Sequence, residues 1–258
     1  MSRIANAFTG GKAFIPFITG GDPDIETSEK LLYALEDAGA DAIEIGIPFS
    51  DPIAEGPVIE QADERALRAG CTTKKLLELV ERARAKIKVP LLFMTYYNPI
   101  FRYGCAAFAK RCADCGLDGL IVPDLPFEER GELLGPCSDH KLDLISLIAP
   151  TSDERIAEIA KHSSGFLYCV SSLGVTGERR SLDDSAKRMI EQAKKAAGIP
   201  CAVGFGISTP EQARHMAAFA DGVIIGSAIV RLVAEHGRGC VEPISRFARE
   251  LKRAIQTI

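Results

Sequence analysis

One acidic residue lies inside a short apolar segment of this sequence. The segment Ala42–Ile47 contains Glu44, with which three isoleucines alternate. Because successive side chains of a strand point to opposite faces, Glu44 shares a face with Ala42 and Gly46. A carboxylate on a buried face costs free energy unless it is paired or protonated. An unpaired Glu in this place has a raised pKa, which suits a general acid or base.

The other apolar segments bear on whether Glu44 is catalytic or part of a structural ion pair. Eight such segments recur along the chain and none contains Lys or Arg, so a cation partner for Glu44 is hard to find. The same absence disfavours a Schiff-base mechanism, which needs a lysine amine. The four histidines fall in helix or loop segments, and no metal site is therefore expected. What remains is acid–base chemistry by carboxylates, with tyrosine available.

The segment that follows Ala42–Ile47 is a candidate functional loop. Residues 48–57 hold three prolines and two carboxylates, Asp51 and Glu55, and are long for a strand–helix connection. Glu55 offers a second acid–base group, or it is a solvated loop charge. Asp51 caps a turn or contributes to the site. Asp124, which follows a later apolar segment, fits a structural turn and a site lining equally well.

Three glycine-bearing loops in the second half of the sequence can bind an anion. They are residues 173–177, 203–208 and 224–227, and the last runs directly into an apolar helical segment. Glycines let backbone amides approach an anion, and a helix amino terminus favours negative charge. We therefore expect a bound phosphate, the alternative being tight turns without a ligand. The stretch Ser172–Ser181 is polar and glycine-bearing, as a lid would be.

The elements that must position these residues follow a repeated pattern. Short apolar runs, typical of buried parallel strands, alternate with segments of helical period. The expected strands are Ala13–Thr19, Ala42–Ile47, Pro90–Tyr96, Gly119–Pro123, Leu144–Ala149, Phe166–Ser171, Pro200–Phe205 and Gly222–Gly226. The expected helices are Asp24–Glu36, Thr72–Ile87, Ala106–Cys115, Ser152–Ala160, Ser181–Ala197, Thr209–Ala218 and Pro243–Ile255.

Strands that alternate with helices favour parallel crossovers, either in an open doubly wound sheet or in a closed barrel. Eight strands, a length of 258 residues and the lack of a dinucleotide-type glycine motif after the first strand favour the barrel. The prediction is an α/β fold, a (β/α)8 barrel of the TIM type, with a short helix within Ser2–Phe8 covering its floor. Loops after the last two strands of such a barrel are a recurrent phosphate site.

Composition limits the class of protein further. Lys and Arg number 31 against 35 Asp and Glu, which gives a net charge of −4, and 47% of the residues are hydrophobic. No basic excess exists for binding nucleic acid, and no apolar stretch approaches the roughly 20 residues that span a bilayer. Because no linker-like segment divides the chain, a single domain over residues 1–258 is predicted.

The cysteines and the amino terminus indicate the compartment. Eight cysteines in a chain of this length do not form the pattern of a disulfide scaffold. Cys112 and Cys115 form a lone C-x-x-C, without the second pair or nearby His that a zinc site needs. The start, Met1–Lys12, carries no apolar signal core. A reduced, cytoplasmic protein is the expectation.

Several segments together match a known pattern. They are Glu44–Pro52 (EIGIPFSDP), Pro16–Pro23 (PFITGGDP), Met94–Pro99 (MTYYNP), Gly174–Gly177 (GVTG) and Val203–Ser208 (VGFGIS). With these segments the sequence closely resembles the alpha subunit of tryptophan synthase over essentially the whole chain. The resemblance implies a retro-aldol cleavage of indole-3-glycerol phosphate to indole and glyceraldehyde 3-phosphate, a carbon–carbon lyase reaction late in tryptophan biosynthesis.

The resemblance also assigns site residues. Glu44 falls on the family's catalytic glutamate, and Glu55 falls on its second carboxylate, which is commonly Asp. The substrate-binding positions that it implies are Phe17, Met94 and Ile121 in the indole pocket, Tyr168, and the loop residues Thr176, Gly177, Gly206, Gly226 and Ser227, whose glycine amides and serine hydroxyl hold the phosphate.

A partner is implied in the same way. The resemblance points to a beta subunit that carries pyridoxal phosphate and consumes indole, in an α2β2 heterotetramer, with no cofactor in this chain. Residues Ile53–Pro57, Asn98–Tyr103 and the lid after Ser171 would face that partner, and a closed lid would favour a water-excluded site.

Glu55 is the main departure from the family pattern. One extra methylene shifts a carboxylate by about 1 Å, and such a misplacement can cost about 10²-fold in rate. Three alternatives therefore stand beside the two-subunit enzyme. They are a free-standing lyase that releases indole, a weakly active subunit that mainly activates its partner, and a sugar-phosphate isomerase on the same barrel, against which Glu44–Pro52 argues.

Overall fold

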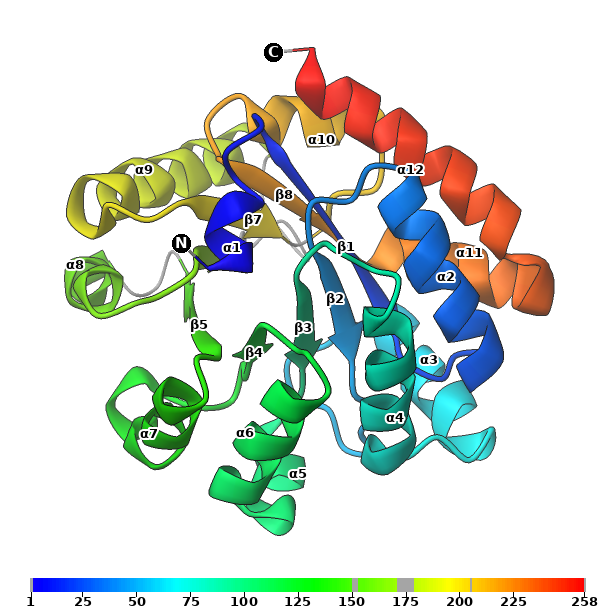
Figure 1. The fold of residues 1–258 in the computed structure, drawn as a ribbon. Helices are drawn as coiled ribbons and strands as arrows, with labels where there is room; N and C mark the ends of the chain where they lie inside the picture. The colour runs from blue at the N-terminus through cyan, green and yellow to red at the C-terminus, as the bar shows by residue number, and fades with distance from the viewer. Residues whose placement is uncertain (1, 150–152, 171–178, 205, 258) are drawn as a thin grey trace.

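Eight parallel strands close into a barrel in the computed structural model, which describes residues 2–149, 153–170, 179–204 and 206–257 (Figure 1). Sheet neighbours are consecutive in the chain, and the last strand pairs with the first, as Ile224 does with Ile15. The strands are β1 (Ala13–Thr19), β2 (Ile43–Gly46), β3 (Leu91–Met94), β4 (Gly119–Ile121), β5 (Asp143–Ile148), β6 (Leu167–Val170), β7 (Cys201–Gly204) and β8 (Gly222–Ile225). The predicted (β/α)8 barrel is confirmed, and closure excludes the open doubly wound sheet.

All helices except the first form a ring outside the strands, and the first lies across one end of the barrel (Figure 1). Within the described residues they are α1 (Arg3–Asn6), α2 (Ile25–Asp37), α3 (Pro57–Arg68), α4 (Thr73–Arg84), α5 (Tyr97–Tyr103), α6 (Cys105–Asp114), α7 (Gly131–Asp139), α8 (Asp153–Lys161), α9 (Arg179–Ala197), α10 (Pro210–Ala217), α11 (Ser227–His236) and α12 (Val241–Gln256), with 3-10 turns η1 (Phe127–Glu129) and η3 (Gly237–Gly239). The carboxyl-terminal helix α12 packs between α2 and α10, so the two ends of the ring meet.

Side-chain caps begin several of the predicted helices. Asp24 accepts a hydrogen bond of 2.7 Å from the N–H of Thr27 at the start of α2. Thr72 and Thr209 cap α4 and α10 in the same way. Such caps satisfy an N–H that has no partner within the helix. The expected cap Ser152 lies outside the described residues.

Three helices of the ring were not predicted from the sequence: α3, α5 and α7. The fully buried positions of α3 are Ala62, Asp63 and Ala66, and its larger residues Val58 and Ile59 are only partly buried, so its apolar period is weak. Helix α7 contains Gly135 and Pro136, both of which are unfavourable inside a helix. Tertiary packing, which the local pattern does not reveal, stabilises these helices.

Side chains of the strands pack in two layers. The isoleucines of β2, Ile43 and Ile45, belong to the layer between the barrel and the helices. Ala42, one position before Ile43, belongs to the cluster inside the barrel. The alternation that the sequence predicts for this strand is therefore confirmed. The interior cluster consists of Ile4, Ala13, Ile15, Ala42, Leu92, Ile121, Ile145, Phe166, Tyr168, Ala202 and Ile224.

The amino-terminal segment closes the floor of the barrel, as predicted. Ile4 of α1 is fully buried among the interior side chains. Phe8 follows and stacks on Phe166, with 5.5 Å between the ring centroids. Because the floor is filled, the interior opens toward the carboxyl ends of the strands.

The state of the cysteines and the length of the helices are two further features of the fold. All eight cysteines are buried and carry free thiols. Among the described residues, no helix combines the length and the apolar character needed to cross a bilayer.

Candidate active site

Glu44 lies inside the barrel, where the described part of the chain offers its carboxylate no partner. It occupies the centre of β2, in register with Phe17 of β1 and Leu92 of β3, and it is 0% exposed. Neither carboxylate oxygen has a hydrogen-bond partner among the described residues. Burial without a compensating cation raises the pKa of Glu44 to about 8. At neutral pH this carboxyl therefore holds a proton that it can release near its working pH.

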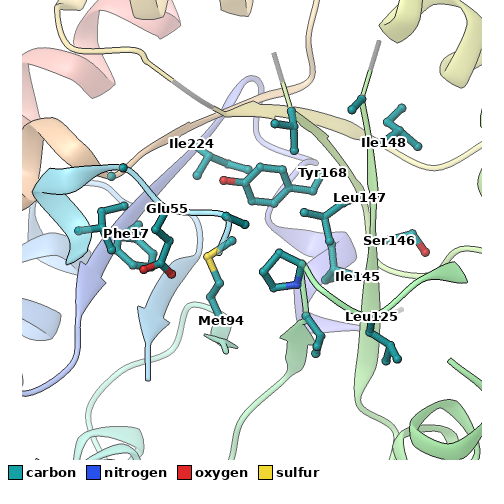
Figure 2. A pocket seen from close by; sticks show the side chains of 18 of the residues that line it. Phe17, Glu55, Met94, Leu125, Ile145, Ser146, Leu147, Ile148, Tyr168 and Ile224 are labelled. Carbon is teal, nitrogen blue, oxygen red and sulfur yellow. The ribbon is translucent and has the colours of Figure 1, made fainter. Parts of the chain in front are cut away.

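A cavity of about 840 Å³ opens at the carboxyl ends of the strands. Phe17, Met94 and Tyr168 lie on its wall, as Figure 2 shows. Ile121, the third residue expected in the indole pocket, is fully buried inside the barrel and is not part of the wall. Glu44 is likewise absent from the wall, but its charge acts on Tyr168, which lines the cavity.

Glycines make room for two of the aromatic side chains. A Cβ at Gly204 would lie 2.7 Å from the hydroxyl oxygen of Tyr168, and one at Gly46 would lie 2.7 Å from Cζ of Phe17. Both distances are too short for any side chain. Burial and the nearby charge of Glu44 raise the pKa of Tyr168 well above its usual value. Tyr168 therefore stays protonated and can act only as a neutral hydrogen-bonding group.

The loop after β2 brings Glu55 to the cavity. The N–H groups of Ile53 and Ala54 donate to the hydroxyl oxygen of Tyr96 at 3.1 and 2.9 Å. Tyr96 also packs on Phe49, with 5.4 Å between centroids. Figure 2 shows Glu55 beside Phe17, with its carboxylate on the Met94 side of the cavity. The loop is thus anchored immediately before its carboxylate.

A second carboxyl contacts Glu55 from α3. Asp63 is 4% exposed, accepts a hydrogen bond of 3.4 Å from the N–H of Phe49, and shares a side-chain hydrogen bond with Glu55. Burial, followed by the charge of Glu55, raises the pKa of Asp63 to about 8. Burial also raises the pKa of Glu55. The sequence analysis did not identify Asp63, because α3 was not predicted.

Another part of the cavity wall can offer backbone amides. Gly206, Gly226 and Ser227 line it, and Gly206 has a φ of +75°, a conformation that favours glycine. Helix α11 begins at Ser227, and its internal hydrogen bonds start with the N–H of Ile229 bonded to Gly226. The amides of the first turn therefore precede the helical ladder, as at an anion site.

Helix α11 also brings an arginine to the cavity wall, on which Arg130 and Arg155 lie as well. Arg231, four residues after Ser227 on α11, lines the cavity and was not singled out from the sequence. The i, i+4 spacing from Ser227 could have indicated it. Thr176, Gly177 and most of the expected lid Ser172–Ser181 lie outside the described residues.

Asp51 and Asp124, for each of which the sequence leaves two roles open, have different surroundings. Asp124 accepts a hydrogen bond of 2.8 Å from the N–H of Tyr97 at the start of α5, and it does not line the cavity. Asp51 is exposed and accepts a hydrogen bond from Ser50. Of the two roles considered for Asp124, the structure supports the structural one.

Comparisons with known proteins agree with this geometry. The family model described as "Tryptophan synthase alpha chain" matches residues 5–256. A tryptophan synthase alpha chain of Lacticaseibacillus casei is 49% identical over 99% of this chain and 96% of the relative, and one of Halalkalibacterium halodurans is 52% identical over 91% and 89%. The crystal structure of tryptophan synthase subunit alpha from Legionella pneumophila superimposes with a TM-score of 0.91 at 37% identity, covering 100% of both chains.

Proposed function

The chain belongs to the tryptophan synthase alpha chain family, and on this premise we propose that Glu44 and Glu55 are the carboxylates with which it cleaves indole-3-glycerol phosphate. Cleavage of that compound to indole and glyceraldehyde 3-phosphate is the known role of the family, the lyase subunit of tryptophan synthase. The observation that carries the assignment is the fully buried carboxyl of Glu44, which has no hydrogen-bond partner among residues 2–149, 153–170, 179–204 and 206–257, inside the barrel that bears the cavity.

The reaction needs one proton delivered and one removed. The bond that breaks joins indole C3 to the glyceryl chain, so C3 is the leaving atom and must first be protonated. Protonation leaves positive charge on the indole ring. Removal of the proton from the adjacent glyceryl hydroxyl then forms the aldehyde, and the electrons of the broken bond return to the indole ring.

Glu44 suits both proton transfers. Its pKa of about 8 means that the carboxyl is protonated near neutral pH and can donate to C3. Once ionised in an apolar interior, the same carboxylate is a strong base for the hydroxyl proton. Each step restores the protonation state that the other requires, so one residue can serve a complete turnover.

Glu55 suits the charge that develops on the ring. Its loop is anchored through Tyr96, and its side chain lies beside Phe17 at the cavity. A carboxylate there can accept a hydrogen bond from the N1–H of the indole ring and stabilise the positive charge of the protonated ring. Phe17 and Met94 supply apolar wall for the ring itself.

The part of the cavity wall formed by the glycines and the start of α11 suits the phosphate of the substrate. Gly206, Gly226, Ser227 and the first turn of α11 offer amides and a hydroxyl for a phosphate, and Arg231 adds positive charge. Binding energy gained there, away from the reacting carbon, orients the substrate for proton transfer. Thr176 and Gly177 are proposed for the same site by resemblance alone.

Members of this family partner a beta subunit. We propose an α2β2 heterotetramer in which the beta subunit carries pyridoxal phosphate and this chain carries no cofactor. Support for the contact face comes from large apolar side chains that point to solvent, namely Ile53 (80% exposed), Phe101 (62%) and Tyr103 (42%). They lie in the segments 53–57 and 98–103, which the resemblance directs toward the partner.

The compartment and the domain organisation belong to the same proposal. Eight free, buried thiols suit a reducing compartment, which supports a cytoplasmic location. One closed barrel built from both ends of the chain supports a single functional domain over residues 1–258.

Incubating the purified chain with indole-3-glycerol phosphate and following indole tests the proposed function. The wild-type chain is expected to release indole, and Glu44→Gln is expected to lose about 10²–10⁴-fold in kcat while keeping its fold and its ligand affinity. Near-normal turnover by this variant would show that Glu44 is not the acid and base. Adding the beta subunit separates the alternatives, because only a free-standing lyase has the same rate with and without it.

A further inference from the structure

The contact between Glu55 and Asp63 joins two acidic side chains in a partly buried place. Asp63 lies on the inward face of α3 beside Ala62 and Ala66, whereas Glu55 comes from the loop just before this helix. The two side chains share a hydrogen bond. Ionised carboxylates are acceptors only. A hydrogen bond between two of them therefore requires that one keep its proton.

The described charges around this contact include no cation that could replace that proton. Asp22 and Glu60 add negative charge near the two carboxyls, and Tyr96 and Cys71 are neutral groups with pKa values raised by burial. Arg65 is the nearest cation on α3, and it makes two hydrogen bonds, of 2.9 and 2.7 Å, to Asp22. Among the described residues, no Lys or Arg forms an ion pair with Glu55 or Asp63.

The hydrogen bonds of the two side chains indicate which one keeps the proton. Asp63 accepts one bond, from the N–H of Phe49, and is more deeply buried than Glu55. Oε2 of Glu55 is buried, and no N–H or O–H group of the described residues donates to it. A proton on Asp63 supplies Glu55 with a donor and leaves the negative charge on the residue that faces the cavity.

We propose that Asp63 is a positioning residue for Glu55: it keeps its proton at neutral pH and donates it in a hydrogen bond to the Glu55 carboxylate. The bond holds the longer Glu side chain in place and keeps it ionised toward the indole N1–H. This role rests on the proposed function of Glu55. When Asp63 loses its proton, two adjacent negative charges repel, and Glu55 is no longer held in place.

A substrate analogue that cannot react gives the most direct test. The probe is 3-(indol-3-yl)propyl phosphate, which has the ring N–H and the phosphate but lacks the hydroxyls needed for cleavage. Its dissociation constant is measured by calorimetry from about pH 7 to about pH 9, where the phosphate stays doubly ionised. All proteins carry Glu44→Gln, so that the titration of Glu44 does not contribute.

Asp63→Asn removes the titration and keeps the hydrogen bonds. An amide can donate to Glu55 and accept from the N–H of Phe49, but it cannot ionise. In the Glu44→Gln parent, the loss of one proton from Asp63 between about pH 7 and about pH 9 is expected to weaken binding of the probe about tenfold. In the Asp63→Asn variant the affinity at about pH 7 is kept and its pH dependence disappears. Asp63→Ala, which lacks a donor, is expected to bind about tenfold more weakly even at pH 7.

Glu60→Gln is the matched control. It removes the same charge from the same helix, but Glu60 is exposed and its effect on Glu55 is purely electrostatic. The control is expected to keep the pH dependence of the parent. If Asp63→Asn fails to fold, Asp63→Thr supplies a hydroxyl donor that does not titrate and is expected to behave in the same way.

The outcome separates the two proposals. Unchanged pH dependence in a folded Asp63→Asn or Asp63→Thr variant, or an equal loss of pH dependence in Glu60→Gln, overturns the role of Asp63. The probe is not cleaved, so these results hold whether or not Glu44 is catalytic. Turnover of the natural substrate by Glu44→Gln, measured separately, decides the proposed function.

Discussion

The ring of Phe17 occupies the space beside Gly46 on the neighbouring strand, where a Cβ would lie 2.7 Å from Cζ of the ring. Gly226 contacts the same ring from the other side, with 3.2 Å from its Cβ position to Cδ1. Phe17 forms part of the cavity wall next to Glu55. Gly46 of β2 and Gly226, which directly follows β8, therefore set the position of an aromatic wall of the proposed indole site.

Gly46→Ala is expected to displace the Phe17 ring and to narrow the indole site. The extra methyl overpacks a buried position, which typically costs about 1–3 kcal/mol of stability. KM for indole-3-glycerol phosphate is expected to rise about tenfold, because the wall no longer fits the ring. Steady-state kinetics and urea denaturation measure the two effects.

Gly131→Ala serves as the control for this change. No atom lies within 4 Å of the Cβ position at Gly131, which begins α7. This variant is expected to keep both the stability and the KM of the wild type. A wild-type KM in a folded Gly46→Ala variant would contradict the assignment of Phe17 to the indole site.

The sequence predicts the barrel and its buried acid because both depend on local alternation. Ile43, Glu44 and Ile45 fix the two faces of β2, and an apolar strand without Lys or Arg leaves Glu44 unpaired. Apolar residues spaced with the period of a strand or of a helix can be recognised in a single sequence.

Asp63 could not be predicted in this way. The fully buried neighbours of Asp63 on its helix are alanines, so α3 leaves only a weak apolar pattern, and the partner Glu55 is brought to it by a loop that Tyr96 anchors. Gly204 is similar, because its role depends on where the Tyr168 ring lies. Contacts of this kind depend on tertiary structure rather than on local pattern.

Glu44→Gln is expected to change how stability depends on pH. The pKa of Glu44 is about 8 in the folded chain against 4.5 without burial, so between these values the folded state binds more protons than the unfolded state. The wild-type free energy of unfolding therefore falls as pH rises through this window, by at most about 1.4 kcal/mol per pH unit for one group. Gln does not titrate, so the variant lacks this contribution.

Urea denaturation at about pH 5, 6.5 and 8 measures the difference between the two proteins. The variant is expected to gain stability relative to the wild type with each step in pH. Other carboxyls with raised pKa values, such as Asp63, are present in both proteins, so their contributions cancel in the difference between the two free energies of unfolding. A difference that is constant across this range would mean that Glu44 is not desolvated in the folded chain.

Gly206→Ala is expected to weaken binding at the phosphate end. A residue with a side chain at φ of +75° is strained by about 1–2 kcal/mol, and relief of that strain moves the amides of the loop. KM for the substrate and the inhibition constant for inorganic phosphate are expected to rise about tenfold, with a smaller change in kcat.

Gly198→Ala controls for the strain alone. Gly198 has a φ of +62° with open space at its Cβ position, and it precedes β7 at the end of the barrel opposite the cavity. Both variants are expected to lose similar stability, whereas only Gly206→Ala should raise KM. Equal KM values in the two variants would remove Gly206 from the phosphate site.

Phe101→Ser is expected to weaken the complex with the beta subunit. Phe101 is 62% exposed and its ring contacts Tyr97 at 6.1 Å between centroids, so the side chain is held in place at the surface. An aromatic residue of this kind is typical of the few positions that dominate an interface, and its loss should cost about tenfold or more in affinity.

Leu67→Ser, at an exposed apolar position on α3 outside the segments 53–57 and 98–103, is the control. Titrating each variant with the beta subunit, with indole release as the signal, should move the midpoint for Phe101→Ser alone. Because Phe101 does not line the cavity, indole release by the isolated variant should equal that of the wild type, and equal midpoints for both variants would place the contact face elsewhere.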